Sequence, residues 1–319
     1  MTTFGYWLSS EEHTPLDLVR NTVRAEQLGF EFAMISDHFH PWLEAQGHAP
    51  FVWSVLGGMA AQTERIRVGT GVTCPMIRIH PAIVAQAAAT TAVMFEGRFF
   101  LGVGTGENLN EHVTGAPWPA PDERLELLEE SIEVMRALWA GEEVTHRGKH
   151  YTVDHAKLYT VPEGPIEVAV AAAAPLAAQL AGRLGDSLVS VSPDEGIVEK
   201  FRGAGGEGPR YGQIQMCWAE SEQEAKETVF RLWRHGGLGG TINQELPRPS
   251  DFDAVAESVT VEMATEGTPC GPDPEPVVEL VREWQEAGYD HLALHQIGGD
   301  QEGFFRFWEQ ELRPRLESS

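Results

Sequence analysis

The 319-residue sequence contains few cysteines and no long uninterrupted apolar run. Its three cysteines, Cys74, Cys217 and Cys270, are far apart and form no C-x-x-C pair. This spacing argues against a disulfide framework and against a zinc site, so we expect no bound metal. No apolar stretch reaches the roughly 20 residues that a membrane-spanning helix needs. No signal-peptide pattern precedes the first predicted strand, so we expect a cytoplasmic protein.

Basic residues are also scarce. The chain has 23 Lys and Arg against 48 Asp and Glu, which gives a net charge of -25. Such a surface repels nucleic acid and anionic lipid, so we expect neither as a partner. The basic residues are nearly all arginine, and an acidic, lysine-poor surface suits a protein kept soluble in high salt, where self-repulsion is screened. We therefore hypothesise a salt-adapted source organism with a GC-rich genome.

Short apolar runs alternate with segments of helical periodicity along the chain. Strands are predicted at residues 4–8, 32–35, 66–70, 99–103, 166–171, 187–190, 214–218 and 292–295. Helices are predicted at 15–28, 51–62, 81–95, 124–139, 176–184, 193–201, 221–235, 277–287 and 303–316. Eight strands alternating with helices predict an α/β fold, a (β/α)8 TIM barrel, rather than a Rossmann sheet.

No sharp domain boundary, internal repeat or low-complexity tract interrupts this alternation, so we predict a single domain over residues 1–319. Two segments lack clear periodicity, at about 141–165 and 236–276. The first contains a predicted hairpin over 144–153, and the second is rich in Gly, Pro and acidic residues, with room for a helix or two. Both are interpreted as insertions in the barrel.

The stretch Ser36-Asp37-His38-Phe39-His40-Pro41-Trp42 follows the predicted strand 32–35. Proline lacks an N–H and pushes its predecessor out of helical geometry, so this stretch indicates a strand-to-loop junction. In parallel α/β proteins, ligands bind at the carboxyl ends of strands. His38 could exchange a proton there near neutral pH, with the adjacent carboxylate fixing its tautomer. The alternative is that Asp37 and His38 only hold the loop together.

Three motifs closely resemble the coenzyme F420-dependent glucose-6-phosphate dehydrogenases of the bacterial-luciferase-like superfamily. They are the stretch 36–42, Gly-His-Ala-Pro at 47–50, and Gly-Val-Gly-Thr-Gly-Glu-x-Leu-Asn-Glu at 102–111. The resemblance covers nearly the whole chain, including 154–162, 181–186 and 313–316. It implies a luciferase-like (β/α)8 barrel and coenzyme F420, a deazaflavin carrier of hydride.

The resemblance assigns catalytic roles to His38, Glu107 and Trp42. His38 resembles the family histidine that exchanges a proton with the substrate hydroxyl, and Glu107 the glutamate beside the deazaflavin N1. Trp42 resembles the tryptophan that packs at the reacting centre. A hydride leaves a carbinol carbon only as the O–H proton is lost, which calls for a base. Considered without the resemblance, Glu107 could instead cap the next helix, and Trp42 could be a core residue.

The resemblance also implies a cofactor site. The predicted contacts to F420 are Asp37, Glu11, Gly71, Val72, Cys74, Thr105, Gly106, Asn110, Ala173, Ala174, Leu176 and Ala177. The Gly71–Val72 bond aligns with a cis peptide under the ring of the cofactor. Two departures concern this site: Cys74 replaces a threonine, and Ala173-Ala174 replaces a glycine pair near the phosphate-bearing tail.

The substrate side departs most from the family pattern. The family binds the sugar phosphate with a threonine, two lysines and an arginine, whereas the matching positions here hold Val191, Asp194, Ala254 and Glu266. A dianionic phosphate facing these carboxylates would be repelled and left without charge-assisted donors. We therefore expect that glucose 6-phosphate is not the substrate, and that a neutral alcohol or sugar is.

The leading hypothesis is a dehydrogenase that transfers a hydride from a non-phosphorylated alcohol or sugar to F420. Three alternatives stay open: a reductase that uses reduced F420 on a carbonyl, imine or activated alkene; an FMN-dependent monooxygenase; and a barrel that binds without catalysis. The His38, Glu107 and Trp42 set argues against the monooxygenase, because oxygen activation needs no such acid–base pair. Family analogy implies a homodimer.

Overall fold

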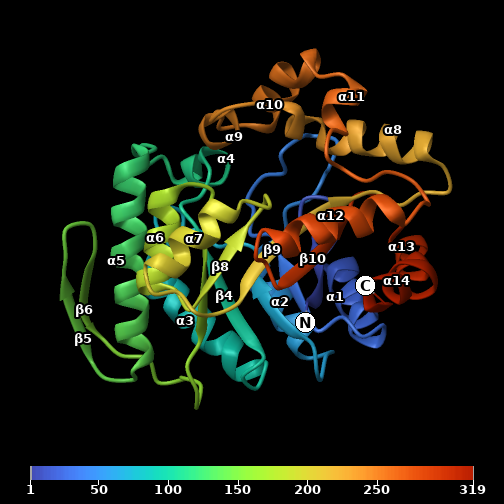
Figure 1. Cartoon of the computed structure of the whole chain (residues 1–319). Helices are drawn as coiled ribbons and strands as arrows, with labels where there is room; N and C mark the ends of the chain where they lie inside the picture. Colours follow the sequence, from blue (N-terminus) through green and yellow to red (C-terminus); the bar gives the residue numbers. More distant parts are fainter. Residues whose placement is uncertain (1, 319) are drawn as a thin grey trace.

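Eight parallel strands form the closed barrel at the centre of the molecule (Figure 1). The structure is a computed structural model and describes residues 2–318. The barrel strands are β1 (Thr3–Leu8), β2 (Phe32–Ile35), β3 (Arg67–Thr70), β4 (Phe99–Val103), β7 (Glu167–Ala171), β8 (Ser187–Ser190), β9 (Arg210–Met216) and β10 (His291–Gln296). The predicted (β/α)8 barrel is confirmed.

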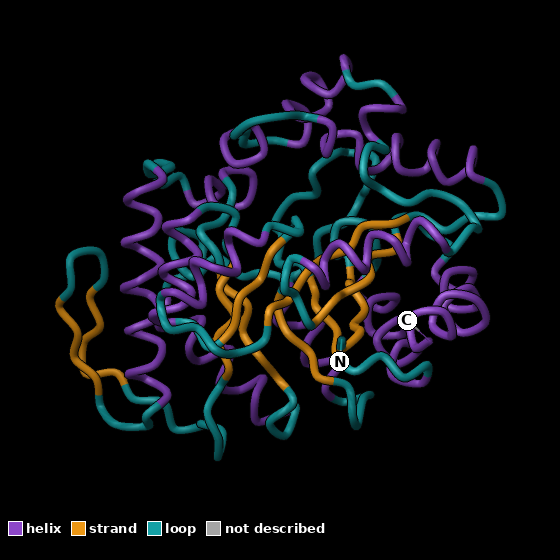
Figure 2. Tube along the Cα trace, viewed as in Figure 1, coloured by secondary structure: helices purple, strands orange, loops and turns teal. Residues whose placement is uncertain are grey.

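Helices surround the barrel on the outside, so that Figure 2 shows strands enclosed by helical coils. The covering helices are α1 (Pro15–Gln27), α2 (Val52–Ala60), α3 (Pro81–Met94), α5 (Pro121–Trp139), α6 (Pro175–Leu184), α7 (Glu195–Gly203), α8 (Glu222–Trp233), α12 (Glu275–Glu286), α13 (Gln301–Phe307) and α14 (Arg313–Ser318). Proline occupies the first turn of α1, α3, α5 and α6, where its missing N–H costs no helical hydrogen bond.

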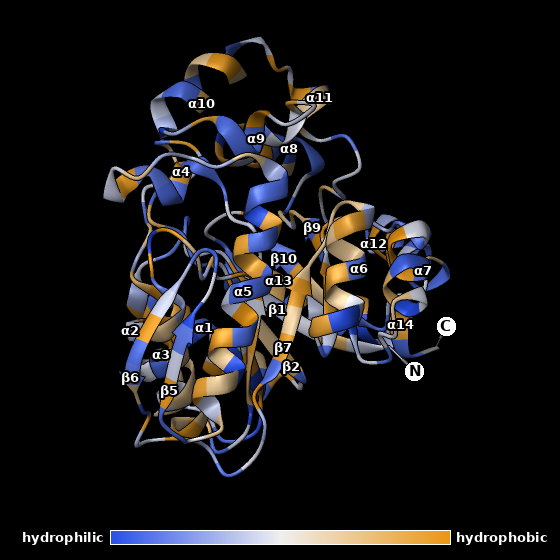
Figure 3. Ribbon diagram, turned by 90° about the vertical axis from the view of Figure 1, so that its left-hand side faces the viewer, coloured by the Kyte–Doolittle hydropathy of each residue, from blue (hydrophilic) through white to orange (hydrophobic). Residues whose placement is uncertain are grey.

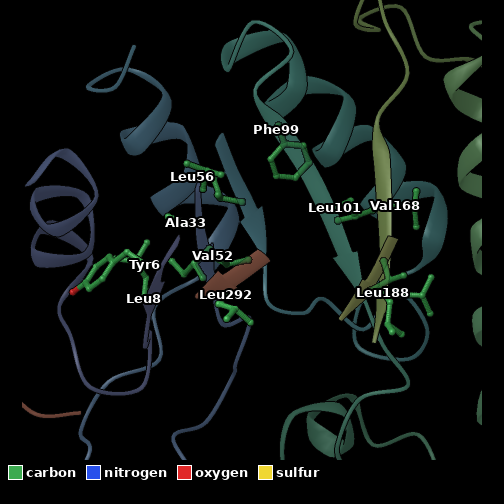
Figure 4. Packing of buried hydrophobic residues seen from close by; sticks show 14 of the residues in the cluster. Tyr6, Leu8, Ala33, Val52, Leu56, Phe99, Leu101, Val168, Leu188 and Leu292 are labelled. Carbon is green, nitrogen blue, oxygen red and sulfur yellow. The ribbon is translucent and has the colours of Figure 1, made fainter. Parts of the chain in front are cut away.

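The core has two layers because successive strand residues point to opposite faces. Outward-facing residues such as Leu8, Leu101 and Val168 belong to the large core cluster between the strands and the helices. Figure 4 shows part of this cluster, with Leu8 near Val52 of α2 and Leu101 near Val168. Inward-facing rings fill the barrel, so it is a packed core rather than a pore. Figure 3 shows this hydrophobic concentration along the strands.

Glycines in the strands make room for the large rings inside the barrel. A Cβ on Gly5 would lie 2.4 Å from the Phe32 ring, and one on Gly69 would lie 2.3 Å from the Phe100 ring. Phe100 in turn stacks on Tyr211 with ring centroids 5.0 Å apart. Any side chain at these two glycine positions would therefore displace the interior packing.

The first insertion is a two-stranded hairpin, β5 (Val144–Arg147) and β6 (Thr152–Ala156), that lies beside α5 (Figure 1). The second insertion contains the short helices η2 (Arg234–Gly237), α9 (Ile242–Glu245), α10 (Pro249–Val255), η3 (Ala256–Ser258) and α11 (Val261–Ala264). We call residues 236–276 the excursion. It lies over the carboxyl ends of the strands, where Asn108 Nδ2 donates to the Glu245 carbonyl at 2.8 Å.

Three local predictions differ from the structure. Strand β9 begins at Arg210, whereas the predicted strand begins at 214. The prediction missed the first residues because polar Gln213 and Gln215 interrupt the apolar pattern that is typical of a strand. A short helix α4 (Asn108–Glu111) and a 3-10 turn η1 (His112–Thr114) precede α5 and were not predicted. The last predicted helix, 303–316, is α13 and α14 joined by a π-helical turn, η4 (Trp308–Leu312), in which Trp308 stacks on Phe30 at 4.4 Å.

Among the described residues, no helix combines the length and the apolar composition that crossing a membrane requires.

Candidate active site

The predicted site residues lie beyond the carboxyl ends of five barrel strands. Glu11 follows β1; Asp37, His38 and Trp42 follow β2; Gly71, Val72 and Cys74 follow β3; Thr105, Gly106, Glu107 and Asn110 follow β4; Ala173, Ala174, Leu176 and Ala177 follow β7. These strands are consecutive neighbours around the barrel. The fold therefore gathers the predicted residues at one end and along one side of the barrel.

His38 forms a pair with Glu11. The His38 Nε2 lies 3.4 Å from Glu11 Oε1, and both side chains are buried. Ser36 Oγ donates a hydrogen bond to Glu11 Oε2 at 2.6 Å, and Ser9 Oγ donates to the same oxygen at 3.0 Å. The two serines hold the carboxyl group in one orientation beside the imidazole.

One hydrogen bond of the His38 ring fixes its tautomer. Nδ1 lies 3.1 Å from the backbone carbonyl oxygen of His40, which can only accept, so Nδ1 carries a hydrogen. Nε2 is the ring nitrogen that faces Glu11, so it is the nitrogen of His38 that can exchange a proton with a ligand beside the pair.

Asn110 links the His38 loop to Glu107. Its Oδ1 accepts from the backbone N–H of Phe39 at 2.9 Å and of His40 at 3.3 Å, while its Nδ2 donates to Glu107 Oε2 at 3.3 Å. Glu107 occupies the N-cap position of α4 but makes no side-chain capping hydrogen bond, so its carboxylate is not used to cap the helix. The amide of Asn110 thus sets the position of Glu107 relative to the loop after His38.

Trp42 packs between the His38 ring and the rings of His235 and Phe252. Its ring centroid lies 5.1 Å from that of His38, and it stacks on His235 at 4.9 Å with an interplanar angle of 14°. Phe252 of α10 meets it edge-on at 5.3 Å. Trp42 is therefore packed as a core residue, and its ring also borders the space beside His38.

Asp37 is held in a buried ionic network. Arg78 donates to Asp37 Oδ1 at 2.8 Å, Thr73 Oγ1 donates to Oδ2 at 2.8 Å, and the backbone N–H of Arg78 donates to Glu111 Oε2 at 2.7 Å. Burial raises the pKa of Glu111, although the Arg78 charge opposes that shift. In this structure the Asp37 carboxylate serves to hold the loops together, which is the alternative that its sequence position left open.

The peptide bond between Gly71 and Val72 is cis, as the resemblance predicts. After it, the chain returns to pair Thr73 with Val103 of β4, which brings Cys74 against the Gly106 turn. Gly106 has φ +69°, and a Cβ there would lie 2.7 Å from the Cys74 sulfur. Burial raises the pKa of the Cys74 thiol well above its ordinary value, so Cys74 is a neutral thiol beside the Gly106 turn.

The segment predicted to bind the cofactor tail forms the start of α6. Ala173, Ala174 and Leu176 are exposed, and Ala174 is the N-cap without a side chain that could cap the helix. The backbone N–H groups of the first turn therefore have no side-chain acceptor, and a helix N-terminus favours an anion. Among the described residues, no hydrogen bond or ion pair joins this segment to His38 or Glu107, so its role stays a prediction.

The positions that match the family phosphate site carry no cation. Val191 is 65% exposed, and Ala254 and Glu266 are also exposed. The Asp194 carboxylate caps α7 by accepting from the N–H of Gly196 at 2.8 Å.

Several residues of the site were not predicted. Arg78 is one, and its position in an irregular loop gives no sequence signal. Ser9 lies two residues before Glu11 and Ser36 lies directly before Asp37, but only the structure shows that both serines meet at the Glu11 carboxylate. His235 lies in η2, directly before the excursion, and burial lowers its pKa to about 3.

Glu12, also not predicted, lies beside the site in a second buried cluster. Trp233 Nε1 donates to Glu12 Oε1 at 2.6 Å, and the N–H of Gly298 donates to Oε2 at 2.7 Å. Burial acts to raise the pKa of Glu12, but His295, whose Nε2 lies 3.5 Å from Oε1, together with His13 and the Trp233 hydrogen bond, outweighs it and holds that pKa below its ordinary value. Glu12 therefore joins the barrel end to α8.

The chain is similar to curated F420-dependent glucose-6-phosphate dehydrogenases over nearly its full length. The protein of that name from Nocardia farcinica is 36% identical over 327 residues, which cover 98% of this chain and 97% of the relative. The one from Mycolicibacterium smegmatis is likewise 36% identical, with the same shares covered.

Two solved structures are similar to this chain over nearly its full length. An F420-dependent secondary alcohol dehydrogenase, solved with an F420–acetone adduct, is 29% identical with a TM-score of 0.90, and 99% of each chain is covered. The F420-dependent tetrahydromethanopterin reductase from Methanopyrus kandleri shares the fold at 21% identity, with a TM-score of 0.79 and 99% of each chain covered. The model of the luciferase-like monooxygenase family matches residues 1–291. The chain therefore belongs to the luciferase-like monooxygenase family, together with the F420-dependent glucose-6-phosphate dehydrogenases.

Proposed function

We propose that this protein is a coenzyme F420-dependent oxidoreductase that transfers a hydride between the CH–OH group of a non-phosphorylated alcohol or sugar and F420. One observation carries the proposal: Asn110 holds the loop of His38 and the carboxylate of Glu107 together at the barrel end. Oxidising an alcohol by hydride transfer requires a base for the hydroxyl proton. A second acid–base group is needed at the acceptor, and Glu107 is placed to be that group.

The residues present fit a deazaflavin. When bound, F420 supplies a ring that accepts or gives a hydride. The ring would be held by residues of the β3 and β4 loops, namely Gly71, Val72, Cys74, Thr105 and Gly106. The first turn of α6, with its free N–H groups, suits the anionic tail. Glu107 would hold or release a proton at its carboxylate.

His38 and Glu11 handle the substrate proton. In the oxidising direction, His38 accepts the hydroxyl proton at Nε2, and the Glu11 carboxylate stabilises the imidazolium that forms. In the reducing direction the same pair returns the proton to the carbonyl oxygen. The flat apolar face of Trp42 excludes water beside His38. The pair therefore serves the reaction in both directions.

A neutral substrate is supported by the absence of cations at the positions of the family phosphate site. Val191 and Ala254 offer no charge there, and the Asp194 and Glu266 carboxylates would repel a phosphate. The structural neighbour with a TM-score of 0.90 is a secondary alcohol dehydrogenase. Small neutral alcohols and non-phosphorylated sugars are therefore the substrates to test.

The test is optical. We expect the purified protein to bleach the visible absorbance of F420 when a secondary alcohol or neutral sugar is added, and to bind FMN poorly. Glucose 6-phosphate should give turnover far below that of the best neutral substrate. Efficient turnover of glucose 6-phosphate at low concentration would refute the substrate proposal, and tight binding of FMN in place of F420 would refute the cofactor.

The residue roles are tested by substitution. His38→Ala and Glu107→Gln should each lower kcat by roughly 10²–10⁴-fold, the range typical of general acid–base groups, with a far smaller change in F420 affinity. Glu11→Gln should also lower kcat, but the double variant with His38→Ala should be no slower than His38→Ala alone, because Glu11 acts through His38. Additive losses, or near-normal turnover of the single variants, would contradict these roles.

A homodimer and a cytoplasmic location complete the proposal. The large apolar side chains of Leu16, Phe51 and Ile83 are more than half exposed in the first turns of the neighbouring helices α1, α2 and α3. Such a group on one face suits contact with a second copy. The three cysteines are free thiols, as in a reducing compartment. Light scattering on the purified protein tests the dimer.

A further inference from the structure

We propose that Cys217 and Cys270 are a redox modification site, at which a disulfide forms and links the two ends of the segment 217–270, which holds α8 and most of the excursion. The two residues are 53 positions apart in the chain, yet they are paired directly opposite one another in an isolated parallel bridge. The Cys217 N–H donates to the Pro269 carbonyl at 2.9 Å, and the Gly271 N–H donates to the Cys217 carbonyl at 2.9 Å. This pairing holds the two backbones in fixed register.

The register places the thiols within reach of a disulfide. Paired backbones in a ladder are about 5 Å apart, and opposite residues project to the same face. A disulfide spans Cα separations of about 4.4–6.8 Å, so the bond requires no backbone movement. Both side chains belong to one hydrophobic cluster with Ala219 and Ile297. In the structure the two thiols donate to different backbone carbonyls, Cys217 to that of Ile297 and Cys270 to that of Thr268. Forming the disulfide therefore needs only rotation of the two side chains.

The two cysteines differ in access, which sets the order of the chemistry. Cys217 is buried, whereas Cys270 is only partly buried and can meet a small oxidant. The Cys270 thiolate attacks a small-molecule disulfide and releases one thiolate, leaving a mixed disulfide on Cys270. The Cys217 thiolate then displaces the second small thiol. In sum, two protein thiols and one small disulfide give one protein disulfide and two small thiols.

The location gives the bond a structural consequence. Cys217 directly follows β9 and Cys270 precedes α12, so the disulfide would close a loop that includes α8 and η2 to α11. This loop carries His235 and Phe252, the two rings that hold Trp42. Oxidation would therefore tie together the two ends of the segment that packs against Trp42.

The experiment oxidises the folded, full-length protein with oxidised glutathione and counts thiols after denaturation. Three thiols should fall to one, and dithiothreitol should restore all three. Non-reducing tryptic mapping should find the peptides of Cys217 and Cys270 joined, with a mass lower by two hydrogens. Burial raises the pKa of both thiols, so the rate of oxidation should rise with pH, because only the thiolate attacks a disulfide.

Matched variants separate this site from general thiol oxidation. Cys217→Ser and Cys270→Ser should each abolish the cross-link, whereas Cys74→Ser, at the third cysteine, should leave it intact. Oxidation should raise the Tm of the wild-type protein by roughly 5 °C and leave the Tm of Cys217→Ser unchanged. The proposal is overturned if all three thiols remain, if Cys270 stops at a mixed disulfide with glutathione, or if another pair is joined. Mapping of the wild-type protein decides the matter even if a variant does not fold.

Discussion

At the scale of single residues, His235 is the buried group whose titration has the clearest effect. It stacks on Trp42, and its Nδ1 has no hydrogen-bond partner in the part of the chain that the structure describes. Burial lowers its pKa to about 3, from an ordinary value of 6.5. The unfolded chain therefore binds a proton at this residue at a pH where the folded protein does not. Stability from this source is present above pH 6.5 and is lost as the pH falls towards 3.

We predict that the free energy of unfolding falls by about 2–3 kcal/mol more in the wild-type protein than in His235→Phe between pH 7 and pH 4.5. Phenylalanine keeps a ring against Trp42 but cannot take up a proton. Urea titrations of both proteins at the two pH values provide the measurement. Equal losses in the two proteins would mean that His235 has the same charge in the folded and unfolded states, either neutral in both or charged in both.

The residues of the site show how far the sequence reaches at this scale. His38, Glu107 and Trp42 were assigned by resemblance, and the structure brings them to one barrel end, although their roles stay predictions. Their link through Asn110 could not be predicted, because hydrogen bonds between loops 70 residues apart leave no periodic signal. The same holds for Arg78, whose ion pair with Asp37 depends on the return of the chain after β3.

At the scale of elements, the hairpin β5–β6 makes three hydrogen bonds to one buried carboxylate of α5. Glu130 accepts from His146 Nε2, from the N–H of His150 and from the N–H of Tyr151, each at 2.9 Å. A Cβ on Gly148 would lie 1.8 Å from Glu130 Oε1, so a glycine is required at the turn. Glu126 of α5 and the Met76 carbonyl accept further hydrogen bonds from the hairpin, but Glu130 accepts the largest share.

We predict that Glu130→Gln accelerates hydrogen exchange of residues 144–156 by tenfold or more, because a neutral amide gives up the charge-assisted bonds and presents donors to donors. The barrel strands should exchange as before. Glu129→Gln is the matched control, since Glu129 pairs only with Arg183 on the surface among the described contacts. Unchanged exchange in the hairpin would show that Glu130 does not hold it.

The elements themselves were largely predictable. Proline at helix starts and apolar runs at strands located most of them within a few residues. The exceptions have physical causes. Strand β9 faces the barrel interior with polar side chains, and the short helices of the excursion are stabilised by packing over the barrel end rather than by their own periodicity.

At the scale of the whole molecule, the main feature is the net charge of -25. The closed barrel brings this charge onto one compact surface, where like charges repel and lower stability. We predict that Tm rises steadily as KCl is increased from low concentration to about 1 M, because salt screens that repulsion. Calorimetry across this range is the measurement. A Tm that does not change with KCl would contradict the hypothesis of salt adaptation.

The closure of the barrel has a further consequence for synthesis on the ribosome. The seam that closes the cylinder joins β1 to β10, with Thr3 opposite His291, so the first strand made must wait for the last. Until nearly the whole polypeptide has emerged, β1 has an open edge towards solvent, and an open edge can pair with other nascent chains. The yield of folded protein during expression should therefore depend on how long the edge of β1 stays open, and on any molecule that covers this edge before β10 is made.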